Sequence, residues 1–166
     1  MKHLLSILCF VFCLLPFTAF ADPVSLKINT PPKWETVEAD VNASRTKVFV
    51  DPSTESRIEV FSKELAKDSQ ADLFFKAIDA QLQQTNFKTD GELQTKNITL
   101  SNGKKRSGKE GLYKYDLSEV PVNVQTFAFN EDTTAYIVVC YYSPTHKDAT
   151  LKVFEDLLKN MTKTGK

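Results

Sequence analysis

Histidine and cysteine, the residues that build many reactive centres, are scarce in this sequence. Its 166 residues include two histidines and three cysteines, and His3, Cys9 and Cys13 all lie close to the N-terminus. His146 and Cys140 alone remain in the rest of the chain. A single cysteine cannot form an intramolecular disulfide. One histidine and one cysteine are also too few to supply the usual nitrogen and sulfur ligands of zinc within a monomer. The sequence therefore predicts a domain held together by packing, with no metal site and no cofactor.

Long apolar runs are absent apart from one at the N-terminus. Residues 4–20 are almost free of polar side chains, follow the basic start Met1-Lys2, and lead to Ala19-Phe20-Ala21. A basic start, a short apolar stretch and an A-x-A site are typical of a secretory signal peptide. The alternative, a membrane anchor, needs about 20 unbroken apolar residues. We predict a signal peptide over residues 1–21, cleaved after Ala21, and one globular domain over residues 22–166 that is periplasmic or secreted.

The chain has no excess of charge of either sign. It carries 21 basic and 21 acidic residues, and loss of Lys2 with the signal peptide leaves 20 basic and 21 acidic, a net charge of −1. Nucleic-acid binding depends on a basic surface that neutralises phosphates, and anionic membranes attract basic proteins. The balance predicts neither a nucleic-acid partner nor stable membrane insertion of the mature protein.

Apolar spacing predicts one α+β domain. Alternating residues favour strands, and a 3.6-residue period favours a helix from Ser69 past Leu82 and another after Ser143-Pro144, with an apolar stripe ending at Met161. Residues 135–142 are apolar at odd and even positions alike, so both faces of that strand must be covered. We predict an antiparallel β-sheet with helices on both faces, a three-layer α/β/α sandwich. The expected strands cover residues 24–28, 47–50, 57–61, 93–100, 111–117, 122–129 and 134–142.

The stretch Ser101-Asn102-Gly103-Lys104-Lys105-Arg106-Ser107-Gly108-Lys109-Glu110 comes close to a phosphate-binding loop. In such a loop a Ser or Thr follows the lysine and a helix follows directly, whereas here Glu110 follows and the next residues alternate as a strand. Asn-Gly favours a tight hairpin turn. The stretch therefore indicates a solvated basic hairpin. Its cationic residues form a candidate contact site for an acidic partner: Lys104, Lys105, Arg106 and Lys109.

Other candidate sites are weaker. Glu38, Asp40 and Asn42 begin like a calcium loop, but the sequence lacks the glycine and the bidentate glutamate that such a loop needs, so a polar loop is expected. We expect His146 to be exposed at the start of the last helix and Cys140 to be a core residue. Paired carboxylates of a hydrolase need no local motif, so that activity stays open although Glu155-Asp156 is expected to be solvated.

Several of these segments resemble the PsbP-like family, which includes PsbP and DcrB-like proteins. The resemblance rests on Pro31-Pro32-Lys33-Trp34, on Arg57-Ile58-Glu59-Val60 and on three later segments, and it spans residues 28–161. The family commonly has glycine at the position of Lys33. The later segments are Gly111-Leu112-Tyr113-Lys114-Tyr115, Ala135-Tyr136-Ile137-Val138 and the apolar residues Phe154, Leu157, Leu158 and Met161 of the last helix.

The resemblance implies an antiparallel sheet with helices on both faces and a role in binding or stabilising larger assemblies. It carries over no catalytic residue. We therefore expect an exported, non-enzymatic accessory or binding protein of the cell envelope that acts through contacts with another envelope protein or complex. Two alternatives remain open: a carrier of a small apolar ligand held between sheet and helix, and a hydrolase that uses unmarked carboxylates.

Overall fold

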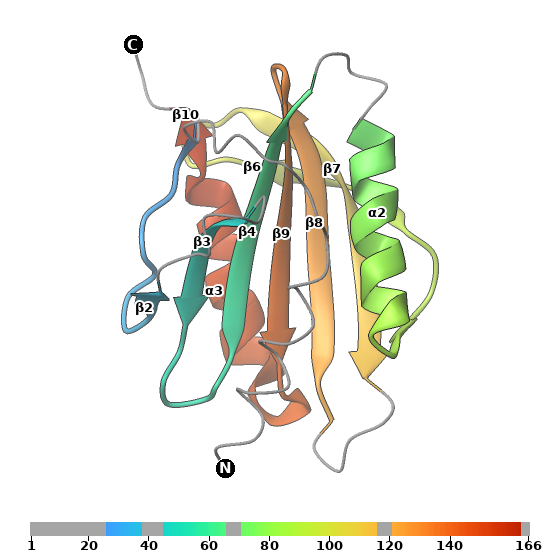
Figure 1. The fold of residues 1–166 in the computed structure, drawn as a ribbon. Coiled ribbons are helices and arrows are strands. Elements are labelled where there is room, and N and C mark those ends of the chain that lie inside the picture. Colours follow the sequence, from blue (N-terminus) through green and yellow to red (C-terminus); the bar gives the residue numbers. More distant parts are fainter. Residues whose placement is uncertain (1–25, 38–44, 66–70, 116–120, 164–166) are drawn as a thin grey trace.

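An antiparallel sheet dominates the structure, a computed structural model that describes residues 26–37, 45–65, 71–115 and 121–163 (Figure 1). Its strands follow the order β2-β3-β4-β9-β8-β7-β5, and β6 pairs with the first half of β7. The strands are β2 (Glu35–Val37), β3 (Arg45–Val50), β4 (Arg57–Glu64), β5 (Phe87–Thr89), β6 (Gln94–Thr99), β7 (Lys105–Tyr115), β8 (Asn123–Glu131) and β9 (Thr134–Tyr142). Two short strands, β1 (Leu26–Lys27) and β10 (Thr162–Lys163), form a separate antiparallel pair.

Helices α2 (Ala71–Gln84) and α3 (Lys147–Asn160) pack with different sets of side chains from the sheet. Alternate residues of β9 belong to the two sets. Tyr136 and Val138 lie in a cluster with Phe154 of α3, whereas Ile137 and Val139 lie in a cluster with Phe74 and other residues of α2. Side chains of one strand alternate between the faces of its sheet. The fold is therefore α+β, with a large antiparallel sheet and two helices.

Strand β9 is buried on both sides, as its apolar sequence predicts. Residues 135–142 are all buried, and the most exposed of them, Tyr142, keeps 5% of its surface. The neighbours β4 and β8 pair with β9 along nearly its whole length. This confirms the central position that the sequence predicts for the segment.

The start of the last helix differs in detail from the prediction. Ser143-Pro144 opens a short 3-10 helix, η2 (Pro144–His146), and α3 begins only at Lys147. The Ser143 side chain makes no capping bond to the backbone. Its hydroxyl lies instead 2.8 Å from that of Thr145. The α-helix therefore does not start directly after Ser143-Pro144, as the sequence predicts, because the chain first closes a tighter turn.

Three of the short strands escape prediction, and β7 is longer than predicted. β2, β5 and β10 contain two or three residues each, too few to show an alternation. β7 begins at Lys105 rather than at Gly111, so the basic run belongs to the sheet. Ser69, expected to open α2, and the oxygen-rich segment Glu38, Asp40 and Asn42 lie outside the described residues.

Candidate functional site

The basic stretch forms the hairpin that joins β6 to β7. Leu100 donates its N–H to the Lys104 carbonyl oxygen at 2.8 Å, and Gly103 donates to the Leu100 carbonyl oxygen at 2.9 Å. These bonds enclose the three-residue loop Ser101-Asn102-Gly103. Gly103 has φ +80°, the left-handed conformation that such a loop needs at its last position. The structure confirms the predicted hairpin turn at Asn102-Gly103.

A second glycine excludes a phosphate-binding loop here. Gly108 lies within β7, and a Cβ atom at this position would lie 2.5 Å from the Ala128 carbonyl oxygen and 2.5 Å from the Phe127 ring. Gly108 therefore allows β7 to approach β8 closely. The residues after Lys109 continue the strand to Tyr115, so no helix N-terminus follows the loop.

Arg106 is not on the surface, unlike the lysines around it. Its side chain is 3% exposed. The guanidinium donates to the Leu158 carbonyl oxygen at 3.3 Å, to the Met161 carbonyl oxygen at 2.8 Å, and to the Glu131 carboxylate at 3.0 Å. It also lies 4.2 Å from the centre of the Phe129 ring. A cation near the last carbonyl groups of a helix is favoured by the helix dipole. Arg106 thus connects β7 to the C-terminal end of α3.

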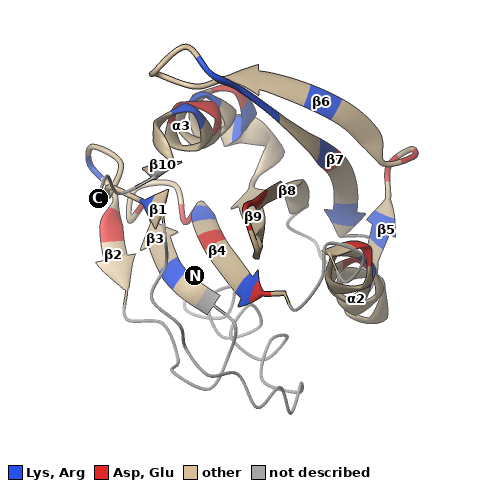
Figure 2. Cartoon of the chain, turned by 90° about the horizontal axis from the view of Figure 1, so that it is seen from above, with Lys and Arg blue, Asp and Glu red and all other residues tan. Residues whose placement is uncertain are grey.

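The loop of the hairpin is attached to the same end of α3. Ser101 donates its N–H to the Lys159 carbonyl oxygen at 2.9 Å. Together with Arg106, this bond gives the tip of the hairpin two attachments to the helix. Figure 2 shows β6 and β7 arching outward from α3, with blue basic segments on the hairpin. The hairpin is therefore a fixed part of the fold.

Three lysines of the hairpin point to solvent. Lys104 and Lys105 are exposed, and neither makes an ion pair within the described part of the chain. Lys109 Nζ lies 3.0 Å from Asp72 Oδ1 of α2, and both side chains are about half exposed or more. Ion pairs between exposed groups are weak and are screened by salt. Of the four predicted contact residues, the structure leaves Lys104, Lys105 and Lys109 accessible and uses Arg106 internally.

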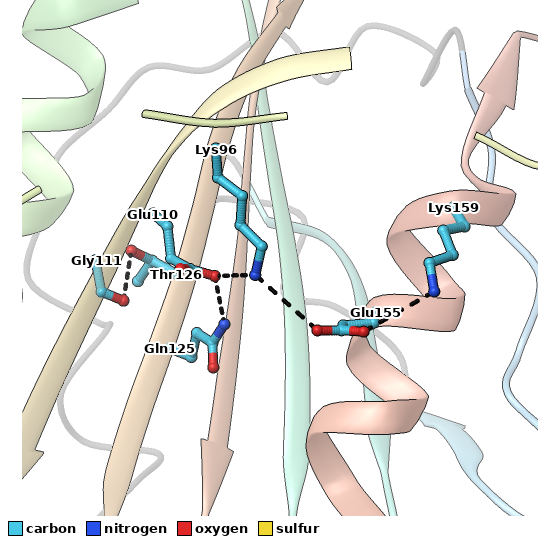
Figure 3. Close-up of polar contacts among 7 residues, drawn as sticks. All are labelled: Lys96, Glu110, Gly111, Gln125, Thr126, Glu155 and Lys159. Carbon is cyan, nitrogen blue, oxygen red and sulfur yellow. Dashed lines mark hydrogen bonds and ion pairs between the residues drawn. The ribbon is translucent and has the colours of Figure 1, made fainter. Parts of the chain in front are cut away.

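A polar cluster lies between the hairpin and α3 (Figure 3). Glu110 Oε1 accepts hydrogen bonds from Lys96 Nζ and from Gln125 Nε2, both at 2.6 Å. Lys96 Nζ also lies 4.0 Å from Glu155 of α3, and Lys159 Nζ lies 3.9 Å from the other oxygen of the same carboxylate. The side chain of Lys96 therefore faces the helix and not the outer side of the hairpin. No motif in the sequence identifies this cluster.

The residues considered for catalysis are far from reactive arrangements. Cys140 is fully buried, and burial raises the pKa of its thiol far above the ordinary range. His146 is exposed in η2, as predicted. Glu155 and Asp156 are 49% and 57% exposed, which confirms that they are solvated. A buried thiol is protonated at neutral pH and is a poor nucleophile.

A shallow cavity lies between α3 and the loop before β2. Its volume is about 170 Å³, and it is lined by Asn29, Thr30, Pro31, Pro32, Val153, Asp156, Leu157 and Asn160. It is formed by the loop before β2 and one side of the helix. The cavity therefore does not lie between sheet and helix, the place expected for a small apolar ligand.

Two further properties concern metals and membranes. Within residues 26–37, 45–65, 71–115 and 121–163, no three His, Cys, Asp or Glu side chains lie close enough to hold a metal ion. No helix in those same ranges is long and apolar enough to cross a membrane.

Solved structures share this fold. LpqN, a Mycobacterium tuberculosis protein involved in cell envelope biogenesis, aligns with 90% of this chain and 88% of its own at 13% identity and a TM-score of 0.58. Cyanobacterial PsbP (CyanoP) from Synechocystis sp. PCC 6803 aligns with 90% of this chain and 99% of its own at 12% identity and a TM-score of 0.54. The Saccharomyces cerevisiae Ran-binding protein Mog1p aligns with 82% and 87% at 12% identity and a TM-score of 0.51.

These similarities define a fold class. The structure has the PsbP-like fold, which it shares with CyanoP, LpqN and Mog1p. A protein from Bacteroides thetaiotaomicron also aligns with 89% of this chain at 12% identity and a TM-score of 0.53, and the chain spans about half, 48%, of that protein's length. No family model matches the sequence, and no curated protein matches it.

Proposed function

We propose that this protein is a non-enzymatic accessory or binding protein of the cell envelope, and that it holds a protein partner through the β6–β7 hairpin. The observation that carries the proposal is the attachment of the hairpin to α3. Arg106 and Ser101 hold the hairpin against the helix, while Lys104 and Lys105 extend from its tip without ion pairs in the described part of the chain. A surface that is rigid before binding loses little entropy when a partner docks.

The three-layer arrangement of helix, sheet and helix belongs to the proposal. Its support is the division of the core into one cluster with α2 and another with α3. With a helix on each face, much of the sheet is covered. The part of the hairpin nearest its loop keeps a surface that remains available for contacts. The exposed side chains at Lys105, Ser107 and Lys109 follow one face of β7 there.

The proposal includes export of the protein and binding to a protein partner. The secretory pattern at residues 1–21 supports delivery to the periplasm or the outside of the cell. LpqN, which shares the fold, is involved in cell envelope biogenesis, and Mog1p, which also shares it, binds Ran. LpqN supports a role in the cell envelope, and Mog1p supports action through a protein contact. Export is tested by Ala21→Phe, which we expect to leave an uncleaved precursor; normal cleavage contradicts the predicted site.

The test of the proposed function is capture of a partner from the native envelope. The experiment compares tagged wild-type protein with the double variant Lys104→Glu/Lys105→Glu and with the matched control Lys76→Glu/Lys152→Glu. The two variants carry charge changes of the same size at exposed sites. We expect wild type and control to recover the same partner, and the hairpin variant to recover roughly tenfold less, since opposite charges promote association. Failure of the wild type to retain a partner, or equal recovery by both variants, overturns the proposal.

A further inference from the structure

We propose that the outer edge of β6 is a strand-addition site, which takes an extended acidic segment of a protein partner as an additional strand of the sheet. This inference rests on the proposed function and specifies how the partner is held. In strand addition, main-chain hydrogen bonds supply affinity and the alternating side chains supply specificity.

The direction of the backbone groups of β6 follows from the hairpin. Leu100 donates its N–H to the Lys104 carbonyl oxygen, which makes this pair a hydrogen-bonded one. Such pairs alternate along an antiparallel ladder. The register pairs Ile98 with Arg106 and Lys96 with Gly108. Residues 96 and 98 therefore bond to β7, and residues 95, 97 and 99, which alternate with them, direct their N–H and C=O groups to the other side.

These outward groups have no partner strand. They belong to Thr95, Asn97 and Thr99, and all three residues are exposed. Within the described ranges, β6 pairs with β7 alone. Figure 2 shows β6 on the outside of the arch that the hairpin forms. An unpaired row of backbone donors and acceptors is a template for another strand.

Edge strands are commonly protected against unwanted pairing by shortness, bulges, prolines or charged side chains. The edge strands β2 and β5 have three residues each. β6 has six, contains no proline, and keeps a continuous register with β7. Its one charged residue, Lys96, points toward Glu110 and α3. β6 is thus a long edge without these protections.

The charge beside this edge selects the class of partner. Thr99 lies opposite Lys105, so their side chains share one face of the hairpin. A residue of the partner's strand that lies beside Thr99 is two strand spacings, about 10 Å, from Lys105. A lysine and a glutamate side chain span that separation together, and Lys104 follows at the same end. An acidic extended segment therefore complements the edge.

Hydrogen exchange with a defined probe tests the inference. The probe is a six-residue peptide, as long as β6, of alternating valine and glutamate, and a peptide of alternating valine and lysine is its control. We expect the acidic peptide to slow exchange of the Thr95, Asn97 and Thr99 amides at least roughly tenfold, while the basic peptide does not. Binding without protection of these three amides overturns the inference.

Proline at Asn97 provides the matched variant. Asn97→Pro removes an outward N–H and no bond to β7, so an edge strand tolerates it, whereas Asn97→Thr keeps the N–H. We expect Asn97→Pro to weaken the acidic peptide roughly tenfold and Asn97→Thr to bind like wild type. Where Asn97→Pro fails to fold, Thr95→Pro, at the next outward position, replaces it. Equal binding by the folded proline variant and wild type overturns the inference.

The outcome also separates this inference from the proposed function. A partner captured from the envelope that is lost on Lys104→Glu/Lys105→Glu but kept by Asn97→Pro contradicts strand addition and leaves the proposed function standing. Failure to capture any partner contradicts the proposed function, and the peptide measurement still decides the inference. A dimer of this chain that Asn97→Pro dissociates overturns the acidic segment as the occupant.

Discussion

Arg106 Nη2 donates a hydrogen bond of 2.8 Å to the carbonyl oxygen of Met161, the residue that directly follows α3 and caps it. The two residues are 55 positions apart in the sequence. A side chain that the sequence places in a solvated basic run is therefore buried and closes a helix terminus. The bond fixes the hairpin relative to the helix, and the rigidity of the proposed contact surface depends on it.

Replacing Arg106 tests this attachment. We expect Arg106→Met to lower the free energy of unfolding by roughly 2–4 kcal/mol, because it leaves two buried carbonyl groups and the Glu131 carboxylate without the guanidinium. Lys104→Met, which removes an exposed charge two positions away, is the control and should change stability by less than about 0.5 kcal/mol. Urea unfolding measures both. An equal, small effect of the two substitutions would falsify the attachment.

Gly108→Ala tests the close approach of β7 to β8. The added methyl group meets the Ala128 carbonyl oxygen and the Phe127 ring at 2.5 Å, and backbone atoms cannot move aside without disturbing the ladder. We expect a loss of roughly 2–3 kcal/mol, typical of forced overpacking. Ser107→Ala, at the exposed neighbouring position, should be nearly neutral. Thermal unfolding distinguishes them, and a Gly108→Ala protein as stable as the Ser107→Ala protein contradicts the packing.

Lys33→Gly should stabilise the protein. Trp34 donates its N–H to the Pro31 carbonyl oxygen at 3.1 Å, and Lys33 has φ +69°. This is a type II turn with Pro32 at its second position and Lys33 at the third, where a positive φ favours glycine. We expect a gain of roughly 0.5–1 kcal/mol from relief of the left-handed conformation. Lys76→Gly, within α2, should instead lose about 1 kcal/mol. A loss in both variants contradicts the strain at Lys33.

Stability should fall in alkali. Burial raises the pKa of Cys140, and it also raises the pKa of Tyr113, together with the hydrogen bond that this phenol donates to Asp79. In the unfolded chain a thiol ionises near pH 8.5 and a phenol near pH 10. The unfolded state therefore loses protons that the folded state keeps, so the contribution is complete below these values and is lost as pH rises.

Urea unfolding across that alkaline range measures the loss. We expect Cys140→Ala to remove the part of the decline that begins near about pH 8.5, although the cavity lowers the stability at neutral pH. Tyr113→Phe should remove part of the decline near about pH 10. A free energy of unfolding that stays constant through this range in the wild type, or declines identically in both variants, contradicts the burial of these groups.

The sequence predicts the large elements well because each depends on a local pattern. The apolar segment of β9 needs cover on both faces, and α2 and α3 carry stripes at helical spacing. The sequence does not predict β2, β5 and β10, since three residues such as Glu35–Val37 form a strand only through pairing with β3. These short strands can therefore be recognised only from their pairing in the folded structure.

The sequence predicts the candidate site only in part, because part of it also depends on contacts between strands. Tyr113 and Tyr115 predict the strand after Gly111, and its alternation continues back to Lys105. Extending that pattern places Arg106 on the face opposite Lys105 and Lys109. Glycine at 108 interrupts this alternation in the sequence, because it has no side chain that marks a face. Its role as a contact with Phe127 requires the neighbouring strand.

Site-specific photo-crosslinking tests the central claim, action through a protein contact at the hairpin, most directly. A benzoylphenylalanine residue replaces Ser107, on the exposed face between Lys105 and Lys109, or Gln83, exposed on α2. After irradiation of the native envelope, we predict one discrete adduct from position 107 that disappears with Lys104→Glu/Lys105→Glu, and none from position 83. No adduct at position 107, or the same adduct from both positions, would contradict the claim.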